Sequence, residues 1–424
     1  MTIMNGNYKQ YELDNGLVVA LQNTPTQTVV AKLRVNYGSS HERKGEEGMA
    51  HFLEHCLVTG GSEKFDPLEA DQVKASLGYT NAHTNIGRTF SDAQILSEDL
   101  GIWLEYISDH VFRPRFDQER VNGERERVLR EISDEKSQPE YLDDLKLKEL
   151  WYRGHPKGIS VLGKEEVVRN ADLEKIASFH RRGYHPNNMD LIIAGGLPVN
   201  VDEMIKGYFG SFATGENTRR DFPELTQLDG KVILHFPAPE RTNKENVEES
   251  SAIIGINYFG CVDGHEDEYA VAVMNHILGS GTNSLLFQNV GLRKGLAYSV
   301  YSWRNGDYSV GEMGVKASVH AGRIEESIDS IFEEFKRMKN QKVDQKTIDK
   351  IKRVAKYNLA KAFETNEGHV SAIEGKMDEG LTPDSFLAGY DQVTPERVIE
   401  VANRYLPERE AGKYVLHIRD PLKR

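Results

Sequence analysis

The sequence predicts an α+β protein built from two homologous halves, each an α/β sandwich with helices packed on a largely antiparallel sheet. Three observations support this fold class. Strand-like segments alternate with long helical segments along the chain. A block near the N-terminus recurs beyond the middle of the sequence. The length of 424 residues suits two domains, and 38% hydrophobic residues are enough for two cores.

Turn residues mark the first elements of the N-terminal half. Residues 16–21 follow an Asp-Asn-Gly turn and are typical of a strand, and a second strand is expected over 29–37. A glycine-containing turn at 45–48 precedes a predicted helix over 49–59. Another helix is expected over 66–77, because Gly78 follows it.

The next segments differ in their periodicity. Residues 80–95 alternate polar and β-branched side chains, as a strand or a hairpin does. Residues 116–135 are rich in Glu, Arg and Leu and contain no proline, so they predict a long helix. Pro139 ends that helix or starts the next one.

An internal repeat supports the two halves. Residues 30–60 align without a gap on residues 251–281, where about two identities are expected by chance. The identical pairs are Ala31/Ala252, Asn36/Asn257, Tyr37/Tyr258, Glu47/Glu268, His55/His276, Leu57/Leu278 and Gly60/Gly281. A duplicated domain explains the alignment better than two accidentally similar strand–helix units. We therefore expect a half over 1–214, a linker over 215–224 and a homologous half over 225–424.

Composition excludes several classes of protein. The net charge of −13 disfavours binding to a phosphate backbone, so no nucleic-acid partner is expected. No apolar run reaches 18 residues, so no membrane partner is expected. Two cysteines, Cys56 and Cys261, cannot make a disulfide framework and suit a reducing compartment. The first eleven residues show neither a hydrophobic leader nor an Arg-rich transit segment, so we expect a cytoplasmic location.

The first half contains a candidate zinc-binding helix. His51, Glu54 and His55 have the spacing i, i+3 and i+4, which places their side chains on one helix face. Two imidazoles at this spacing can bind one Zn²⁺, and the carboxylate can take a proton from a water that the metal activates. This order of residues is the inverzincin signature. The alternative is a polar helix face with two hydrogen-bonded histidines.

The repeat indicates that only one half binds metal. At the positions aligned with His51, Glu54 and His55, the second copy has Ala272, Asn275 and His276, so one ligand and the candidate base are missing. This difference predicts a single metal site in a duplicated enzyme, with one Zn²⁺ per chain.

A catalytic zinc usually has three protein ligands, and the predicted helix over 116–135 offers the third. Glu124, Val128 and Glu131 lie along one stripe of this helix. Glu131 is our candidate ligand, and Glu124 is expected to orient the site. The alternative is a solvated face on which these glutamates pair with Arg125, Arg127 and Arg130. Cys56 is rotated about 100° from His55 and is not expected to bind metal.

GMAHFLEHCLVTGG (48–61) and GERERVLREI (123–132) resemble motifs of the pitrilysin-type zinc metallopeptidases, the family of insulin-degrading enzyme and mitochondrial processing peptidase. The resemblance implies that His51, His55 and Glu131 bind zinc, that Glu54 is the general base and that Glu124 assists catalysis. It also implies a clam-shell of two halves and the small prokaryotic single-chain form. The expected activity is hydrolysis of short or unfolded peptides in a closed chamber.

Two further motifs imply substrate contacts. TNAHTN (80–85) resembles the edge strand that pairs with substrate in this family, which implicates Asn81, Ala82, His83 and Thr84. GLAYSVYS (295–302) resembles the second-half motif, in which Tyr298 contacts the substrate or the transition state. Relatives often have an arginine where this chain has Gly291. Either Arg293, two residues later, reaches the site, or a partner chain supplies the missing group.

The expected partners are a peptide or unfolded polypeptide substrate and, by analogy with small relatives, a second copy in a homodimer. A heterodimer with a homologous chain is the alternative. Three other functions stay open: a non-catalytic subunit, a peptide-binding or chaperone-like module, and a zinc hydrolase that acts on a non-peptide amide.

Overall fold

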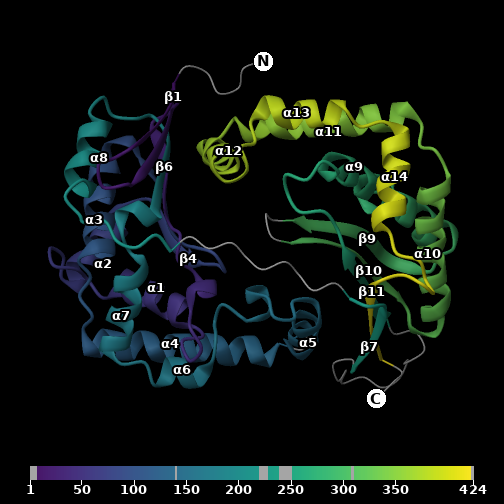
Figure 1. Cartoon of the computed structure of the whole chain (residues 1–424), viewed down its shortest axis with the longest axis horizontal. Helices are drawn as coiled ribbons and strands as arrows, with labels where there is room; N and C mark the ends of the chain where they lie inside the picture. Colours follow the sequence, from purple (N-terminus) through teal and green to yellow (C-terminus); the bar gives the residue numbers. More distant parts are fainter. Residues whose placement is uncertain (1–6, 139–140, 219–227, 238–250, 307–309, 422–424) are drawn as a thin grey trace. The chain divides into compact units, whose positions relative to one another are not determined.

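The computed structural model describes residues 7–138, 141–218, 228–237, 251–306 and 310–421. The chain divides into two compact units, one of residues 1–222 and 360–378 and the other of residues 223–359 and 379–424. Each unit has its own sheet and its own hydrophobic core (Figure 1). Among the helices of the described residues, none combines the length and the apolar character that crossing a bilayer requires.

The sheet of the first unit has six strands, and only β2 and β6 run parallel to each other. Strand β4 lies at one edge, so one side of its backbone has no partner in the sheet. In spatial order the strands are β1 (Tyr8–Glu12), β2 (Val18–Asn23), β6 (Met189–Gly195), β3 (Thr28–Val35), β5 (Thr89–Leu96) and β4 (Tyr79–Thr84).

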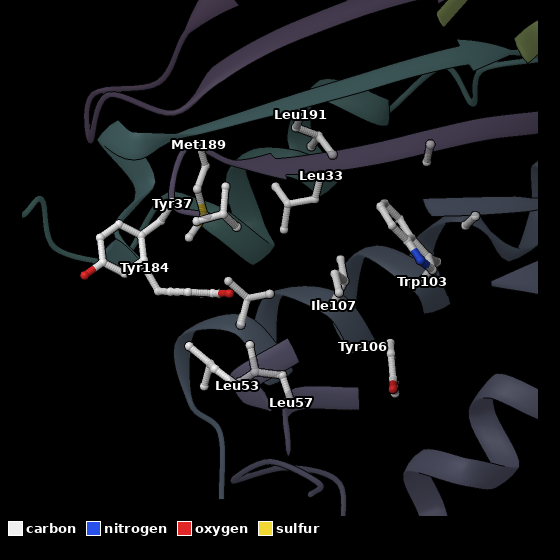
Figure 2. Close-up of a cluster of buried hydrophobic side chains, with 14 of the residues drawn as sticks. Leu33, Tyr37, Leu53, Leu57, Trp103, Tyr106, Ile107, Tyr184, Met189 and Leu191 are labelled. Carbon is white, nitrogen blue, oxygen red and sulfur yellow. The ribbon is translucent and has the colours of Figure 1, made fainter. Parts of the chain in front are cut away.

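Helices from the same half cover one face of this sheet. Figure 2 shows Leu33 of β3 and Leu191 of β6 near Leu53 and Ile107, which belong to two of these helices. Burial of this apolar face is the main favourable contribution to folding of the unit. The helices of the half are α1 (Met49–Thr59), α2 (Pro67–Ser76), α3 (Leu100–Phe112), α4 (Gln118–Ser137), α5 (Tyr141–Trp151), α6 (Glu165–Arg169), α7 (Leu173–Gly183) and α8 (Val201–Phe209).

The opposite face of the same sheet is covered by α12 (Asn366–Glu379), which comes from far along the chain (Figure 1). Val370 and Ile373 of α12 pack on strand residues such as Ala20 and Val30, which alternate with the residues of the main core. Asn366, at the first turn of α12, donates a hydrogen bond of 3.0 Å to the backbone oxygen of Thr28. The central strands β2, β6 and β3 are therefore covered on both faces.

The sheet of the second unit repeats the first. Only β7 and β11 are parallel, and every other neighbouring pair is antiparallel. Its order matches that of β2, β6, β3, β5 and β4, so the predicted pair of homologous α+β halves is confirmed. The strands are β7 (Lys231–Pro237), β11 (Tyr414–Asp420), β8 (Ser251–Phe259), β10 (Gly311–His320) and β9 (Ala297–Gly306), and the helices are α9 (Glu268–Gly279), α10 (Ile324–Asn340), α11 (Gln345–Ala362), α13 (Pro383–Asp391) and α14 (Pro395–Tyr405).

The predicted elements of the first half occur with shifts of at most two residues at their ends. The segment over 80–95 is a hairpin of β4 and β5, and the helix predicted over 66–77 begins at Pro67 because Asp66 caps it. Part of the predicted linker, 219–224, lies outside the described residues. The division of the chain by contacts differs from the expected boundaries because residues 360–378 group with the first half.

Candidate metal centre

Two features of helix α1 place His51, Glu54 and His55 at the site: the glycine that precedes the helix and the apolar side chains that the helix buries. Gly48 precedes the helix with a φ of 102°, and a Cβ atom there would lie 2.6 Å from the backbone oxygen of Leu162. Phe52 and Cys56, each rotated about 100° from the histidine that precedes it, are buried in the core. Cys56 is therefore a core residue, and burial raises the pKa of its thiol.

Helix α4 supplies the glutamates. Asp117 caps the helix by accepting hydrogen bonds from the backbone N–H groups of Glu119 and Arg120. Val128 and Ile132 are buried, and Val128 lies on the same stripe as Glu124 and Glu131. The packing of this apolar side of α4 on α1 brings both carboxylates to the histidines.

The three predicted ligands converge. One ligand atom each from His51, His55 and Glu131 lies within 4.8 Å of the others. The Nε2 atoms of the two histidines are 3.3 Å apart, and Glu131 Oε2 lies 3.7 Å from His51 Nε2 and 3.6 Å from His55 Nε2. Within the described part of the chain, this is the only such group of three.

The orientation of His55 and the protonation state of His51 suit a metal cation. Glu124 Oε2 accepts a hydrogen bond from His55 Nδ1–H over 2.9 Å, so His55 Nε2 is the nitrogen that faces the cluster. Burial, together with the nearby His55, lowers the pKa of His51 to about 4, so this ring is neutral at neutral pH. Two imidazoles and a carboxylate are the donor set that Zn²⁺ takes in many hydrolases. The residues therefore fit the metal.

Glu124 is anionic in this setting. Burial opposes its charged form, but the hydrogen bond from His55 and the positive charge of Arg127 outweigh it and hold the pKa of the carboxyl below its usual value. Arg127 Nη1 lies 3.9 Å from Glu124 Oε2, and Arg127 Nε lies 3.9 Å from Glu131 Oε1. The alternative, in which these glutamates pair with arginines on a solvated helix face, is therefore correct in part, since Arg127 approaches both Glu124 and Glu131. Arg125 does not pair with them and donates instead to the backbone oxygens of Val168 and Ala171.

Glu54 is a buried carboxyl beside the cluster, with 7% of its surface exposed. Thr84 of β4 donates a hydrogen bond of 2.7 Å from Oγ1 to Glu54 Oε2. Burial raises the pKa of Glu54, and the hydrogen bond from Thr84 partly offsets that effect. A carboxyl with a raised pKa is suited to accept and return a proton near neutral pH.

These groups line a cavity of about 510 Å³. The lining includes the His-His-Glu cluster, Glu54 and the β4 residues from Thr80 to Thr84. It also includes Trp103, Tyr106 and Ile107 of α3, which belong to the hydrophobic core of the half (Figure 2). The cavity therefore combines reactive polar groups with apolar side chains.

The predicted substrate-contacting residues fall into two groups. Asn81, Ala82, His83 and Thr84 lie on the edge strand β4, and all four line the cavity. Tyr298 and Arg293 belong to the second unit. Tyr298 is 94% exposed on β9, and Arg293 ends a π-helical segment, Leu286–Arg293. Their roles stay predictions.

Sequence reasoning did not single out two residues of this site. Asp92 of β5 pairs with His83 over 3.2 Å, from Oδ2 to Nδ1, and Tyr184 lines the cavity next to Thr89. Asp92 lies opposite Asn81 in the hairpin, so the alternation of the 80–95 segment was the available signal for it. No local pattern marks Tyr184, because it reaches the cavity from the end of α7.

The fold and the cluster define a class of duplicated α+β proteins in which one half carries a His-His-Glu group that could hold a metal ion. Residues 17–165 match the family model described as insulinase, peptidase family M16, and residues 170–354 match the M16 inactive domain. The chain belongs to peptidase family M16.

Similar proteins are known from several bacteria. The uncharacterized zinc protease YmxG of Bacillus subtilis is 27% identical over 94% of this chain and 96% of its own length. A zinc protease of Mycobacterium leprae is 31% identical over 76% of this chain and 71% of its own. A protease from Helicobacter pylori has a similar fold, with a TM-score of 0.81, 19% identity and coverage of 98% of this chain and 99% of that chain.

Proposed function

We propose that this protein is a zinc-dependent endopeptidase that hydrolyses short or unfolded peptides. The observation that carries the proposal is the convergence of His51, His55 and Glu131 within 4.8 Å, beside a buried carboxyl of Glu54 in the same cavity. The names of similar proteins, such as the zinc protease of Bacillus subtilis, support the same reaction.

The residues of the site have distinct roles in this proposal. His51, His55 and Glu131 would hold one Zn²⁺, which lowers the pKa of a bound water toward about 7. Glu54 takes a proton from the attacking water and returns it to the leaving amine. Glu124 keeps His55 in the tautomer that presents Nε2 to the metal. The free edge of β4 can add a peptide as a further strand, so affinity comes from main-chain hydrogen bonds and sequence preference is loose.

The test is a digest of an unstructured peptide mixture by the purified chain, analysed by mass spectrometry, with and without a chelator. We expect cleavage that the chelator abolishes and that added zinc restores. Glu54→Gln should keep the metal and reduce kcat by several orders of magnitude, because it removes the proton acceptor while keeping the shape of the side chain. Cys56→Ser is the matched control on the same helix and should retain zinc and activity.

Other outcomes would select the alternatives. Zinc binding without cleavage would favour a subunit that needs a partner chain. Peptide binding without cleavage or zinc would favour a binding module, and turnover of only non-peptide amides would favour a different hydrolase. Sedimentation of the purified chain tests the expected homodimer, and Tyr298→Phe and Arg293→Ala test the proposed substrate contacts through KM.

A further inference from the structure

Glu54 is held at only one of its two oxygens. Within the described residues, the carboxylate receives a single hydrogen bond, from Thr84 Oγ1 to Oε2 at 2.7 Å. This bond is short and is made to a buried group, so it restricts the rotation of the carboxylate. Among the same residues, Oε1 has no comparable bond and is the oxygen left to exchange a proton.

Thr84 is itself fixed by its neighbours in the hairpin. It lies directly opposite Thr89 in the β4–β5 register, and the two hydroxyl oxygens are 3.4 Å apart. Thr89 is buried and donates its own proton to the backbone oxygen of Tyr37 over 3.0 Å. Since each hydroxyl has one proton, the proton of Thr84 stays available for Glu54.

The turn that joins the two strands is also held in place. Asn85 Oδ1 accepts hydrogen bonds from the backbone N–H groups of Gly87 and Arg88, at 2.9 and 2.7 Å. A threonine is stiff about χ1, so a hairpin that fixes the backbone also fixes the direction of Oγ1. The hydroxyl is therefore preorganised before any substrate arrives.

We propose that Thr84 is a positioning residue, which holds Glu54 through Oε2 so that Oε1 takes the proton from water and later returns it to the leaving nitrogen. The inference rests on the proposed peptidase function. It assigns Thr84 a role that differs from the substrate contact implied by the family resemblance, since the hydroxyl proton is committed to Glu54. Loss of a substrate contact would change KM, whereas loss of a residue that positions Glu54 would lower kcat.

The experiment compares the wild-type chain with Thr84→Val and Thr84→Ser. Thr84→Val removes the hydroxyl that donates to Glu54 at nearly constant volume. Thr84→Ser keeps that hydroxyl and is the matched control. For each variant, kcat and KM are measured on an unstructured fluorogenic peptide, together with zinc per chain and the melting temperature.

We expect Thr84→Val to bind zinc and to melt like the wild type, with kcat reduced about tenfold or more and KM changed less than about twofold. Thr84→Ser should recover most of kcat. A wild-type kcat in Thr84→Val, a change in KM alone, a loss of zinc, or a Thr84→Ser variant as slow as Thr84→Val would each overturn the inference. If the wild-type chain cleaves no peptide, the proposed function itself is wrong.

Discussion

At the scale of single residues, the hydrogen bond between His55 and Glu124 determines which nitrogen of His55 faces the candidate metal site. Glu124 accepts the Nδ1 proton of His55 over 2.9 Å and stays anionic, because that hydrogen bond and Arg127 together outweigh its burial. The tautomer of one ligand is thus set by a residue that does not belong to the converging group of three. A carboxylate that accepts a proton from a metal-binding histidine affects both metal affinity and ligand geometry.

The first prediction concerns this pair. Glu124→Gln should weaken zinc affinity by about 10- to 100-fold, since an amide can present its N–H₂ group to His55 and no longer favours one tautomer. Competition with a chromophoric chelator measures the affinity. Arg127→Gln is the control, because it leaves the His55 hydrogen bond in place and should change the affinity less.

A second prediction concerns His180 of α7, which donates Nε2–H to the backbone oxygen of Val111 over 2.8 Å. Burial lowers the pKa of His180 to about 4 in the folded state, from its usual value near 6.5. The unfolded chain therefore binds a proton in this range that the folded chain does not bind. Stability contributed by His180 is full above about pH 6.5 and decreases by about 3 kcal/mol as the pH falls toward 4.

Urea unfolding at several pH values tests this prediction, with His180→Gln as the comparison. The amide of glutamine can still donate to Val111 but does not titrate. The variant should thus lose less stability than the wild type between pH 6.5 and 4. Equal slopes in the two proteins would show that His180 does not contribute.

At the scale of elements, α1 depends on the residue that precedes it. Gly48 has a φ of 102° and lies so close to the segment around Leu162 that a side chain does not fit. Gly45, in the same turn, has a φ of 89°, and a Cβ atom there would meet no other atom within 4 Å. A side chain at Gly45 would therefore cost only the free energy of an unfavourable φ. A side chain at Gly48 would add the free energy of a steric clash.

The third prediction uses this pair. Gly45→Ala should lower the free energy of unfolding by about 1 kcal/mol, as expected for alanine at positive φ. Gly48→Ala should cost more, and it should reduce zinc occupancy because α1 begins at the next residue. Chemical unfolding and metal analysis provide the two readouts. Similar losses in both variants would mean that the clash with Leu162 is relieved cheaply.

The sequence predicts those elements whose signals are local. Helix α1 over 49–59 occurs as expected because a glycine turn and an apolar face define it, and α4 is shifted by two residues at each end. His51, Glu54 and His55 share a face through helical spacing alone. Glu131 could not be separated from a solvated face by spacing, since only the packing of α4 on α1 brings it to the histidines.

Other features depend on tertiary contacts and carry no local signal. The hydrogen bond from Thr84 to Glu54 joins an edge strand to a helix, and neither segment indicates the other. Likewise, nothing in the segment over 366–379 shows which sheet Val370 and Ile373 cover. The domain limits expected from the repeat therefore did not include residues 360–378 in the first unit.

At the scale of the whole molecule, ion pairs that differ in burial connect α12 to the first sheet. Arg34 of β3 is 1% exposed and contacts Asp190 and Asp378 over 3.1 and 3.0 Å. Arg88 reaches the same Asp378 with two nitrogens, at 2.7 and 2.8 Å. Lys32, two residues before Arg34 on the same face of β3, pairs with Glu374 nearer the solvent. The buried pairs contribute mainly because their loss leaves a charge uncompensated.

The fourth prediction compares the buried Arg34 with the more exposed Lys32. Arg34→Met should lower the free energy of unfolding by about 3–5 kcal/mol, because Asp190 is 2% exposed and loses its cation. Lys32→Met should cost about 1 kcal/mol or less, and added salt should reduce that cost further. Denaturant unfolding at low and high salt measures both. A larger effect at Lys32 than at Arg34 would contradict this account of the interface.

The position of α12 also has a consequence for biosynthesis. The last strand of the first sheet ends at Gly195, whereas the helix that covers its second face begins at Asn366. At about 5–20 residues per second, a ribosome needs on the order of ten to thirty seconds to make the chain between them. During that interval Arg34, Ala20 and Val30 remain uncovered on the nascent protein. A fragment that stops before α12 keeps the whole of α1 and yet leaves that face open to chaperones and to aggregation.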